Sequence, residues 1–269
     1  MSIPLQLKLL RVGKCRHLEC IAARGGRLAW IDFPALCGLI RHPTRGWILY
    51  DTGYASHFYD ATNDWPERLM RAFVPIELPE SEVLLTQLRG YGIHRDDIKT
   101  VVISHYHPDH IAGLKDFPKA QFIALASDTK VFQEIKTARW LATLKAQFKG
   151  LLPIDYFNRL RYVEDTALRS LPKWMNPFEF AYDLFGDGSI LGIPLPGHTV
   201  GQLGLYLPQA NGRPTFLVGD ACWSIRACRE GRLPAGITRL VKYSFSDYSK
   251  TFFKLQKLSQ RESALACLP

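Results

Sequence analysis

The sequence lacks any long apolar run. No apolar segment of about 18 residues occurs in it, whereas a helix that crosses a bilayer needs roughly 20. Near the N-terminus, Lys8, Arg11 and Lys14 interrupt the stretch where a signal peptide would need unbroken apolar sequence. These absences argue against a membrane partner and predict a cytoplasmic protein.

Paired cysteine spacing is missing too. The six cysteines are scattered and form no CxxC motif, which argues against a disulfide framework. In a reducing compartment they are most simply free thiols. They are Cys15, Cys20, Cys37, Cys222, Cys228 and Cys267.

No linker rich in Pro, Gly or Ser divides the chain, and no repeat or low-complexity stretch occurs. With 47% apolar composition, 269 residues can bury a sizeable core. We therefore expect a single domain over residues 1–269. The segment at about 150–182 is rich in proline and aromatics and fits neither helical nor strand spacing, so we interpret it as an insertion or a cap over one face.

Clusters of basic residues are absent, although the formal net charge is +9 from 34 basic and 25 acidic residues. No group of about five or more basic residues occurs, which indicates a solvated basic surface. Such charge supports nonspecific attraction to nucleic acid or anionic lipid without defining a site. We expect no specific nucleic-acid partner, and composition does not define the oligomeric state.

What the sequence does contain is a series of short apolar runs, each bounded by turn residues and ending in a polar tip. Such runs predict β-strands. Segments with helical spacing between them predict helices at about 80–91, 128–148 and 246–260, with Asp128 and Ser246 as N-caps of the last two. The strand candidates are GWILYDTG (46–53), TVVISH (100–105), AQFIAL (120–125), SILGIPLPGH (189–198), QLGLYLP (202–208) and TFLVGD (215–220).

The segment VVISHYHPDHIAGL carries a dense group of possible metal ligands: His105, His107, Asp109 and His110. The chain has only eight histidines, so a chance cluster is improbable. His105 and His107 stand two residues apart at a strand end, where alternate side chains share a face. Asp109 and His110 follow the turn at Pro108. Two imidazoles can thus face one ion and the next two ligands a second ion, an arrangement that suits zinc.

Two more candidates end apolar runs: His198 in PLPGHTVG and Asp220 in LVGDACW. Each alone is weak evidence, but strand ends can bring both to the same sheet edge. The remaining histidines lack ligand spacing, and we interpret them as surface or structural, with His57 as the first alternative ligand. They are His17, His42, His57 and His94.

The order HxHxDH, glycine-histidine, glycine-aspartate resembles the metallo-β-lactamase superfamily over about residues 45–225. The resemblance implies an α+β fold, an αββα sandwich of two mixed β-sheets flanked by helices, with metals in a cleft at one edge. It also implies that Asp51, in YDTG, supports the metal loop without binding metal. The implied ligands are His105, His107 and His198 for the first ion, Asp109 and His110 for the second, and Asp220 bridging both.

The resemblance further implies a seventh ligand, a histidine after the strand that follows the last helix. No histidine follows His198 in the 269 residues, and SALACLP stands where that strand is expected. Either the second ion lacks one protein ligand or the chain is shortened relative to its relatives. We expect two Zn²⁺ per chain with the second held weakly, and Mn²⁺, Fe²⁺ or Co²⁺ as alternatives.

Two divalent ions that share a water can activate it to attack an ester, with Asp109 or Asp220 relaying the proton. ILYDTG, ISHYHPDHIAGL and PLPGHTVGQLGLYL are most similar to the N-acyl homoserine lactonase branch. We therefore predict a dinuclear hydrolase that opens a lactone or cleaves another small-molecule ester. Those lactonases commonly carry a tyrosine that assists at the substrate carbonyl where this chain has Trp223, and an indole can donate a hydrogen bond but cannot shuttle a proton.

Other branches are less consistent with the sequence. Flavodiiron proteins have glutamate where this chain has His107, and true class B β-lactamases lack the bridging aspartate, here Asp220. A thioesterase of the glyoxalase II type is the second hypothesis and a phosphodiesterase the third. A weakly catalytic or noncatalytic ligand-binding member also stays open, favoured by the missing histidine and by Trp223.

Overall fold

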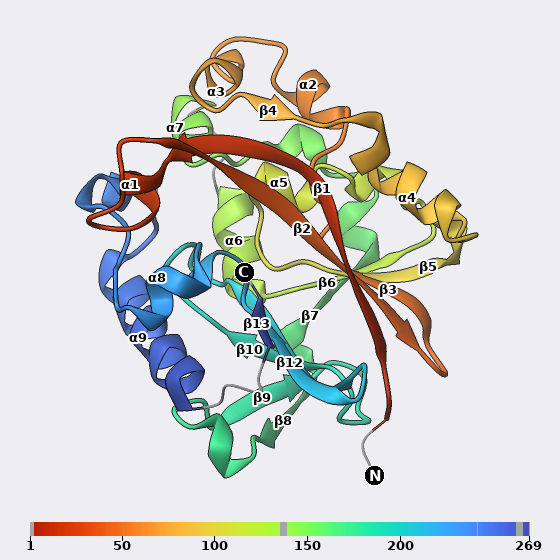
Figure 1. Ribbon diagram of the computed structural model, residues 1–269. Helices are drawn as coiled ribbons and strands as arrows, with labels where there is room; N and C mark the ends of the chain where they lie inside the picture. The colour runs from red at the N-terminus through yellow and green to blue at the C-terminus, as the bar shows by residue number, and fades with distance from the viewer. Residues whose placement is uncertain (1–2, 135–138, 241, 262–265, 269) are drawn as a thin grey trace.

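A computed structural model of the protein describes residues 3–134, 139–240, 242–261 and 266–268. Two β-sheets pack face to face, and helices cover their outer faces (Figure 1). The αββα sandwich predicted from the sequence is thereby confirmed. Within the described parts of the chain, no helix is long and apolar enough to cross a lipid bilayer.

The first sheet is built mainly by the N-terminal half of the chain. Its strands are β1 (Gln6–Leu18), β2 (Trp30–His42), β3 (Gly46–Tyr50), β4 (Ile76–Glu77), β5 (Ile98–Val102), β6 (Gln121–Ala124) and β7 (Leu160–Tyr162). They lie in the order β4-β1-β2-β3-β5-β6-β7. The sheet is mixed, because β4, β1, β2 and β3 pair antiparallel whereas β3, β5, β6 and β7 pair parallel.

The second sheet comes from the C-terminal half. Its strands are β8 (Ala167–Ser170), β9 (Phe180–Asp183), β10 (Leu191–Pro194), β11 (Leu203–Ala210), β12 (Arg213–Leu217) and β13 (Ala266–Leu268). They lie in the order β13-β12-β11-β10-β9-β8. All neighbours pair antiparallel except β12 and β13, which run parallel.

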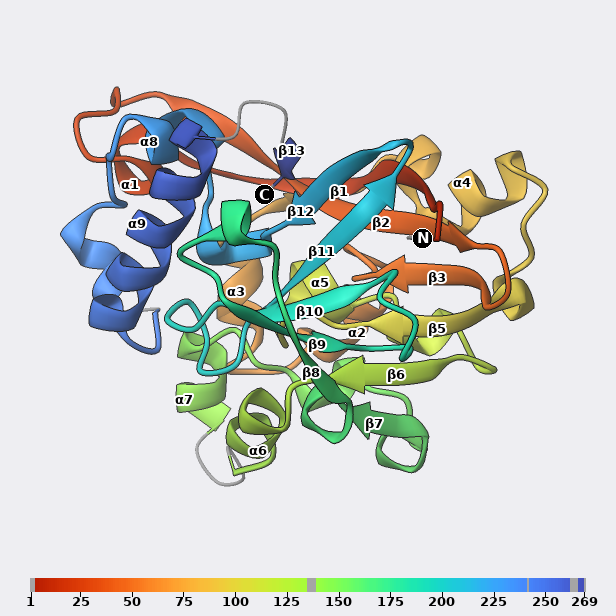
Figure 2. The ribbon, with the colours of Figure 1, turned by 90° about the horizontal axis from the view of Figure 1, so that it is seen from below.

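Helices flank the two sheets on opposite sides. Figure 2 shows α8 and α9 beside the second sheet and α4 beside the first, with the short α1, between β1 and β2, lying next to α8 and α9. The bounds are α1 (Glu19–Ala22), α2 (His57–Ala61), α3 (Arg68–Phe73), α4 (Leu84–Gly90), α5 (Pro108–Ile111), α6 (Ala126–Glu134), α7 (Arg139–Leu144), α8 (Ile225–Arg229) and α9 (Phe245–Arg261).

Strand alternation divides the apolar side chains among three layers. Ile48 of β3 and Val102 of β5 pack between the sheets against Leu205 of β11. Because successive strand residues point to opposite faces, Leu49 packs instead beneath the helices of the first sheet. In the same way, Phe216 of β12 packs toward α8 and α9. Each sheet is therefore buried on both faces, which explains why the strand candidates read as nearly continuous apolar runs.

The predicted elements largely match the observed ones. Each strand candidate contains a strand, namely β3, β5, β6, β10, β11 and β12. The helices expected at 80–91 and 246–260 correspond to α4, preceded by a 3-10 turn at Glu80–Glu82, and to α9. The helix expected at 128–148 corresponds to α6 and α7, and residues 135–138 between them lie outside the described part; its expected end at 148 is wrong, because α7 ends at Leu144.

Both predicted N-caps are wrong by about half a turn. Asp128 and Ser246 lie within α6 and α9, which begin at Ala126 and Phe245. The hydroxyl of Ser244 accepts a hydrogen bond from the backbone N–H of Asp247 at 3.2 Å, the geometry of an N-cap. Asp128 has a different role, described below.

The long β1–β2 hairpin was not predicted. The pairing of the two strands shifts between Arg11 and Lys14, so the two-residue alternation of β1 is interrupted in its middle. The segment at about 150–182 supplies β7 to the first sheet and β8 and part of β9 to the second. That it forms an insertion or cap stays a prediction.

Candidate metal centre

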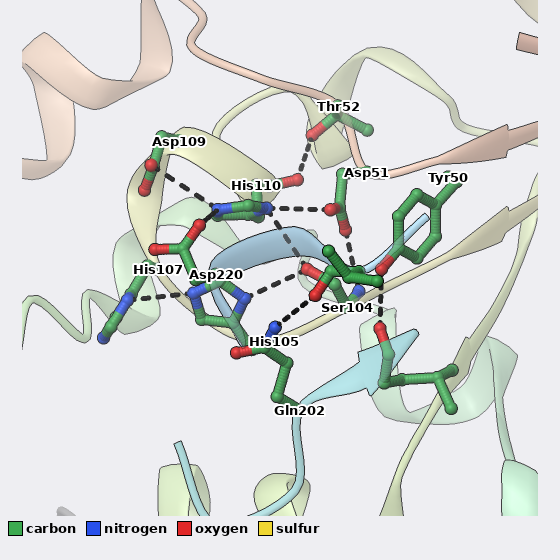
Figure 3. Close-up of polar contacts among 12 residues, drawn as sticks. Tyr50, Asp51, Thr52, Ser104, His105, His107, Asp109, His110, Gln202 and Asp220 are labelled. Atoms are coloured by element: carbon green, nitrogen blue, oxygen red, sulfur yellow. Dashed lines mark hydrogen bonds and ion pairs between the residues drawn. The ribbon is translucent and has the colours of Figure 1, made fainter. Parts of the chain in front are cut away.

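Polar residues that follow several strands meet at one edge of the sandwich (Figure 3). Asp51 directly follows β3, and the loop with His105 and His107 follows β5. His198 lies in the turn between β10 and β11. Asp220 lies in a 3-10 turn, Gly219–Ala221, after β12. The strand ends thus bring together residues that are up to 169 positions apart, from Asp51 to Asp220.

A first cluster, His105, His107, His198 and Asp220, has one possible ligand atom from each residue within 4.8 Å of all the others. The Nε2 atoms of His105 and His198 each lie 2.9 Å from Nδ1 of His107. Nε2 of His198 also lies 3.1 Å from a carboxylate oxygen of Asp220. The structure therefore brings together all the residues expected around the first ion.

A second cluster, Asp109, His110 and Asp220, meets the same 4.8 Å criterion and shares Asp220 with the first. Nε2 of His110 lies 3.5 Å from Asp109 and 3.4 Å from Asp220. It is buried and forms no hydrogen bond with any described residue. The other expected ligands thus lie beside the first cluster, with Asp220 between the two.

Strand alternation does not align His105 and His107, so that part of the prediction is wrong. β5 ends at Val102, and both histidines lie in the loop beyond it. Pro108 then begins the short helix α5, in whose first turn the carbonyl of His107 accepts the N–H of His110 at 3.0 Å. This turn, started by a proline at the first helical position, presents Asp109 and His110 one after the other.

Asp51 lies behind the second cluster and is 1% exposed. One carboxylate oxygen accepts the backbone N–H of Ser104 at 2.7 Å, and the other lies 2.7 Å from Nδ1 of His110. The backbone of Asp51 adopts a φ of 62°, an uncommon conformation for a residue other than glycine. A carboxylate at Nδ1 fixes the ring orientation and, when the imidazole is neutral, keeps its proton on Nδ1, so that Nε2 is the possible ligand atom toward the cluster.

The turn that carries His198 is held on one side by α9. The backbone N–H of Tyr243 donates to the carbonyl of His198 at 3.0 Å. Gly197 has a φ of +130°, and a Cβ added there would lie 2.0 Å from the backbone nitrogen of Tyr248. Only glycine permits this close approach, so the start of α9 sets the position of His198.

On the other side the same turn is held by Asp128 of α6, which is 1% exposed. Its carboxylate accepts the backbone N–H of Gly201 at 3.4 Å. Burial raises the pKa of Asp128 to about 6, although hydrogen bonds from Thr199 and Gly201 oppose this shift. Sequence reasoning assigned Asp128 only to a helix cap, because nothing local indicates that it contacts a turn 73 residues away.

Burial and neighbouring charges shift the pKa values of the clustered side chains in opposite directions. Burial lowers the pKa of His107 to about 3 and that of His105 well below its usual range. Burial alone would also lower the pKa of His110, but the carboxylates of Asp109 and Asp51 raise it well above its usual range. The pKa of Asp220 is held far down by His198 and His110 despite burial. His105 and His107 are therefore neutral beside ionised carboxylates, whereas the carboxylates around His110 favour its protonated form.

This donor set fits divalent cations. With Ser104 Oγ 3.0 Å from Nδ1 of His105, the Nε2 lone pair of that ring can point into the first cluster. Nδ1 of His107 is approached by two other ring nitrogens at 2.9 Å, and three mostly neutral imidazoles, two of them buried, cannot satisfy one another fully by hydrogen bonds. Convergent imidazole nitrogens with a shared carboxylate are typical zinc ligands.

Trp223 lies at the border of this centre. Its indole N–H donates to Asp220 at 2.9 Å, and its ring packs edge-on against His198 with centroids 5.8 Å apart. With Asp109, His110 and Asp220 it lines a cavity of about 90 Å³ whose other walls are mostly apolar residues of β1 and β2. Sequence reasoning missed Lys242, whose ammonium nitrogen lies 3.9 Å from the centre of the Trp223 ring, because an isolated lysine carries no motif.

The remaining histidines lie outside both clusters. His57 pairs with Asp116 at 2.8 Å, and His94 caps a 3-10 turn. His42 is fully buried and lies 3.1 Å from the hydroxyl of Ser189, in the GDGS turn. His17 packs edge-on against Phe33, with centroids 5.6 Å apart.

Comparisons with known proteins identify relatives over most of the chain. The chain is 25% identical over 266 residues to N-acyl homoserine lactonases AttM of Azorhizobium caulinodans and of Rhizobium radiobacter, covering 97% of this chain and 90% of each relative. It is 29% identical over 196 residues to the metallo-hydrolase mfmC of Annulohypoxylon moriforme, covering 70% of this chain and 48% of that protein.

Solved structures show the same fold. An N-acyl homoserine lactone hydrolase with the product N-hexanoyl-L-homoserine at its catalytic metal centre superposes with a TM-score of 0.72 at 15% identity, covering 100% of this chain and 93% of that chain. The dizinc quorum-quenching lactonase AidC gives a TM-score of 0.62 at 17% identity, covering 100% and 90%. Residues 30–211 match the sequence profile of the metallo-beta-lactamase superfamily, and the chain belongs to that superfamily.

Proposed function

We propose that this protein is a dinuclear metallohydrolase that opens a lactone or cleaves another small-molecule ester. The observation that carries the proposal is the pair of ligand clusters sharing Asp220, with three imidazoles in one and a second carboxylate in the other. The broader class, a metal-dependent hydrolase acting on ester bonds, is that of the relatives named above. Zinc is the proposed metal, because the ligands are mainly imidazoles.

Each cluster residue has a proposed role. His105, His107 and His198 would hold the first ion, Asp109 and His110 the second, and Asp220 both. Bound ions would supply a water of lowered pKa and polarise the carbonyl under attack. Asp51 would position the metal loop, by holding the His110 ring and the backbone of Ser104.

The chain's own acids would move the proton. Asp109 is the better candidate, since Asp220 already accepts the indole N–H of Trp223 and lies against His198. Asp109 has a side chain that is 29% exposed, which allows exchange with solvent. Trp223, with its N–H engaged, would contact a substrate through its hydrocarbon edge and supply no proton.

The lactonase hypothesis is supported by the AttM relatives, which are named N-acyl homoserine lactonases. A separate solved structure of the same fold holds N-hexanoyl-L-homoserine at its catalytic metal centre. A weakly catalytic ligand-binding member is the second candidate. It is favoured by the direction of the Trp223 N–H, which points at Asp220 and is therefore not free for a substrate carbonyl. The cytoplasmic location stays a prediction, since neither the fold nor the site tests it.

A substrate panel tests the proposal. Purified protein with added zinc or manganese is assayed on lactones, simple esters, thioesters and phosphodiesters, alongside a His105→Ala variant as the metal-ligand control. Turnover of lactones or esters that His105→Ala abolishes would support the proposal. Preference for thioesters would indicate the glyoxalase II type, and metal binding without turnover of any class would favour the ligand-binding alternative.

A further inference from the structure

Lys242 is a buried lysine in the segment that joins the 3-10 turn Gly236–Leu240 to α9. It is 2% exposed. Its Nζ atom lies 3.9 Å from the ring centre of Trp223 and 3.5 Å from that of Tyr248. No hydrogen-bond acceptor for Nζ occurs among the described residues. Two aromatic faces are thus the immediate surroundings of this nitrogen.

Such a position needs a physical explanation, because burying an amine without a hydrogen-bond partner is unfavourable. The negative faces of the two rings compensate in part, since a cation over an aromatic face is attracted by the ring quadrupole. Burial lowers the pKa of Lys242 to about 7, and Asp220 opposes that shift. The lysine is therefore close enough to the metal centre for its charge to be felt at Asp220.

Trp223 connects Lys242 to the centre. One face of the indole meets Lys242, and its edge packs against His198. Its N–H donates at 2.9 Å to the oxygen of Asp220 that also lies 3.1 Å from Nε2 of His198. A cation on the face of an indole draws electron density from the ring and strengthens N–H donation. The orientation of the shared carboxylate thus depends on where the indole is held.

We propose that Lys242 is a positioning residue of the metal centre, which contacts the rings of both Trp223 and Tyr248 and so holds the indole where its N–H fixes the carboxylate of Asp220. The inference rests on the proposed function in one respect, that Asp220 binds metal. It assigns Lys242 and Trp223 to metal retention, with an effect on turnover only through Asp220. Neither residue needs to touch the substrate.

A double-mutant cycle on zinc binding tests this. Lys242→Met removes Nζ at nearly equal length, Trp223→Phe removes the indole N–H, and the double variant combines both. Zinc affinity is measured on metal-free protein by competition with a chelating dye. Lys242→Met should bind zinc about five- to thirtyfold more weakly, the range for a desolvated cation–π contact. Trp223→Phe, which loses a hydrogen bond to a charged carboxylate, should lose at least about as much affinity. The double variant should be no weaker than the weaker single variant, because both changes break the same chain of contacts.

Three further measurements separate positioning from general stability. Lys250→Met, on α9 and with a side chain that is 70% exposed, is the matched control and should retain wild-type affinity. Lys242→Arg should recover most of the affinity, because it restores a cation over the rings. Thermal unfolding of the metal-free proteins shows whether lost affinity merely follows lost stability. If Lys242→Met does not fold, Lys242→Gln replaces it in the cycle.

The outcomes are distinct. Additive effects in the cycle, or unchanged zinc affinity in Lys242→Met, would overturn the inference even if ester hydrolysis proceeds. A wild-type protein that binds no zinc would overturn it as well. Conversely, a non-additive loss of zinc affinity in a protein that hydrolyses no ester would support the inference and contradict the proposed function.

Discussion

His110 shows how single residues decide the chemistry of this centre. One ring nitrogen lies 2.7 Å from Asp51, and the other lies between Asp109 and Asp220 at 3.5 and 3.4 Å. Asp51 therefore orients the His110 ring, and the other ring nitrogen faces the carboxylates of Asp109 and Asp220. Asp128 is a second residue whose single contact matters, because its buried carboxyl group fixes the backbone of a turn far away in the sequence.

We predict that His110→Ala removes the second ion and lowers ester turnover by roughly 100-fold or more, since loss of even an outer-sphere partner of a metal ligand costs 10- to 100-fold. The fold should persist, because His110 lies in a short helical turn at the surface of the core. Elemental analysis and circular dichroism measure the two effects. His94→Ala, at an exposed cap, is the control, and two ions per chain in His110→Ala would disprove the assignment.

Asp128→Asn should flatten the dependence of stability on pH. The pKa of Asp128 is raised from 3.8 to about 6 by burial, so between about pH 4 and 6 the folded protein holds a proton that the unfolded chain releases. The free energy of unfolding therefore falls as pH rises through this window, by at most about 3 kcal/mol. Urea unfolding from pH 4 to 7 measures this, with exposed Asp165→Asn as control. An equally steep dependence in Asp128→Asn would contradict the prediction.

At the scale of elements, the centre is built from turns that follow strands and not from the strands themselves. α5 presents Asp109 and His110, the 3-10 turn after β12 presents Asp220, and the turn after β10 presents His198. The last of these has no helix of its own to order it, so it depends on α6 and α9, which contact it from two sides.

Gly197→Ala adds only one methyl group, but it should lower both the stability of the protein and its zinc content. The added Cβ would lie 2.0 Å from the backbone of Tyr248, so α9 or the His198 turn must move, and we expect a loss of about 3 kcal/mol or more in stability. Zinc content should fall with it, as measured by elemental analysis and chemical unfolding.

Gly212→Ala is the matched control for that change. Gly212 has a φ of +79°, but nothing lies within 4 Å of an added Cβ. The cost should then be only the left-handed backbone, about 1–2 kcal/mol, with zinc content unchanged. Equal losses in the two variants would show that close packing at Gly197 is unimportant.

At the scale of the whole molecule, the packing of the two sheets brings residues that are far apart in the sequence to one edge of the sandwich. Its two sheets pack through Ile48 and Leu205, which brings the polar ends of β3 and β5 beside those of β11 and β12. The centre receives unequal numbers of ligands from this arrangement. The first cluster has four residues, whereas the second has three, one of them shared.

We predict that the second ion binds more weakly than the first. Purified protein should carry fewer than two metals per chain and gain activity on addition of zinc, manganese or cobalt, because three protein ligands leave part of the shell to water or substrate. Calorimetric titration of metal-free protein measures both sites. Two equally tight sites would refute the prediction and require another ligand; His57, paired with Asp116, would first have to leave that partner.

An added histidine should strengthen the second site. β13 runs parallel to β12 with Leu268 beside Leu217, and Asp220 follows β12 at the edge toward which both strands run. Extending the chain past Pro269 by a few residues that include a histidine should raise metal occupancy and turnover. The same extension with alanine is the control, and equal occupancy in the two forms would argue against a ligand role.

The sequence by itself indicated the strands that carry the site and the dense group of possible ligands from His105 to His110, because short apolar runs with polar residues after them are local signals. The fold class and the full set of converging residues followed from the resemblance to the metallo-β-lactamase superfamily. The β1–β2 hairpin was not predicted, because the shift in strand pairing between Arg11 and Lys14 interrupts the two-residue alternation of β1. The roles of α6 and α9 as supports of the His198 turn were not predicted either, because no local pattern indicates them.

Tertiary structure alone decided how the ligands are held. The contacts of Asp128 with Gly201, of Gly197 with Tyr248, and of Lys242 with Trp223 join residues 19 to 73 positions apart. Periodicity and spacing report what one segment does by itself, whereas these contacts depend on which segments the sheet order and helix packing place side by side. Once that packing exists, burial changes the pKa of Asp128 and leaves the Lys242 nitrogen with two aromatic rings for neighbours, because both groups have lost the water that surrounds them in the unfolded chain.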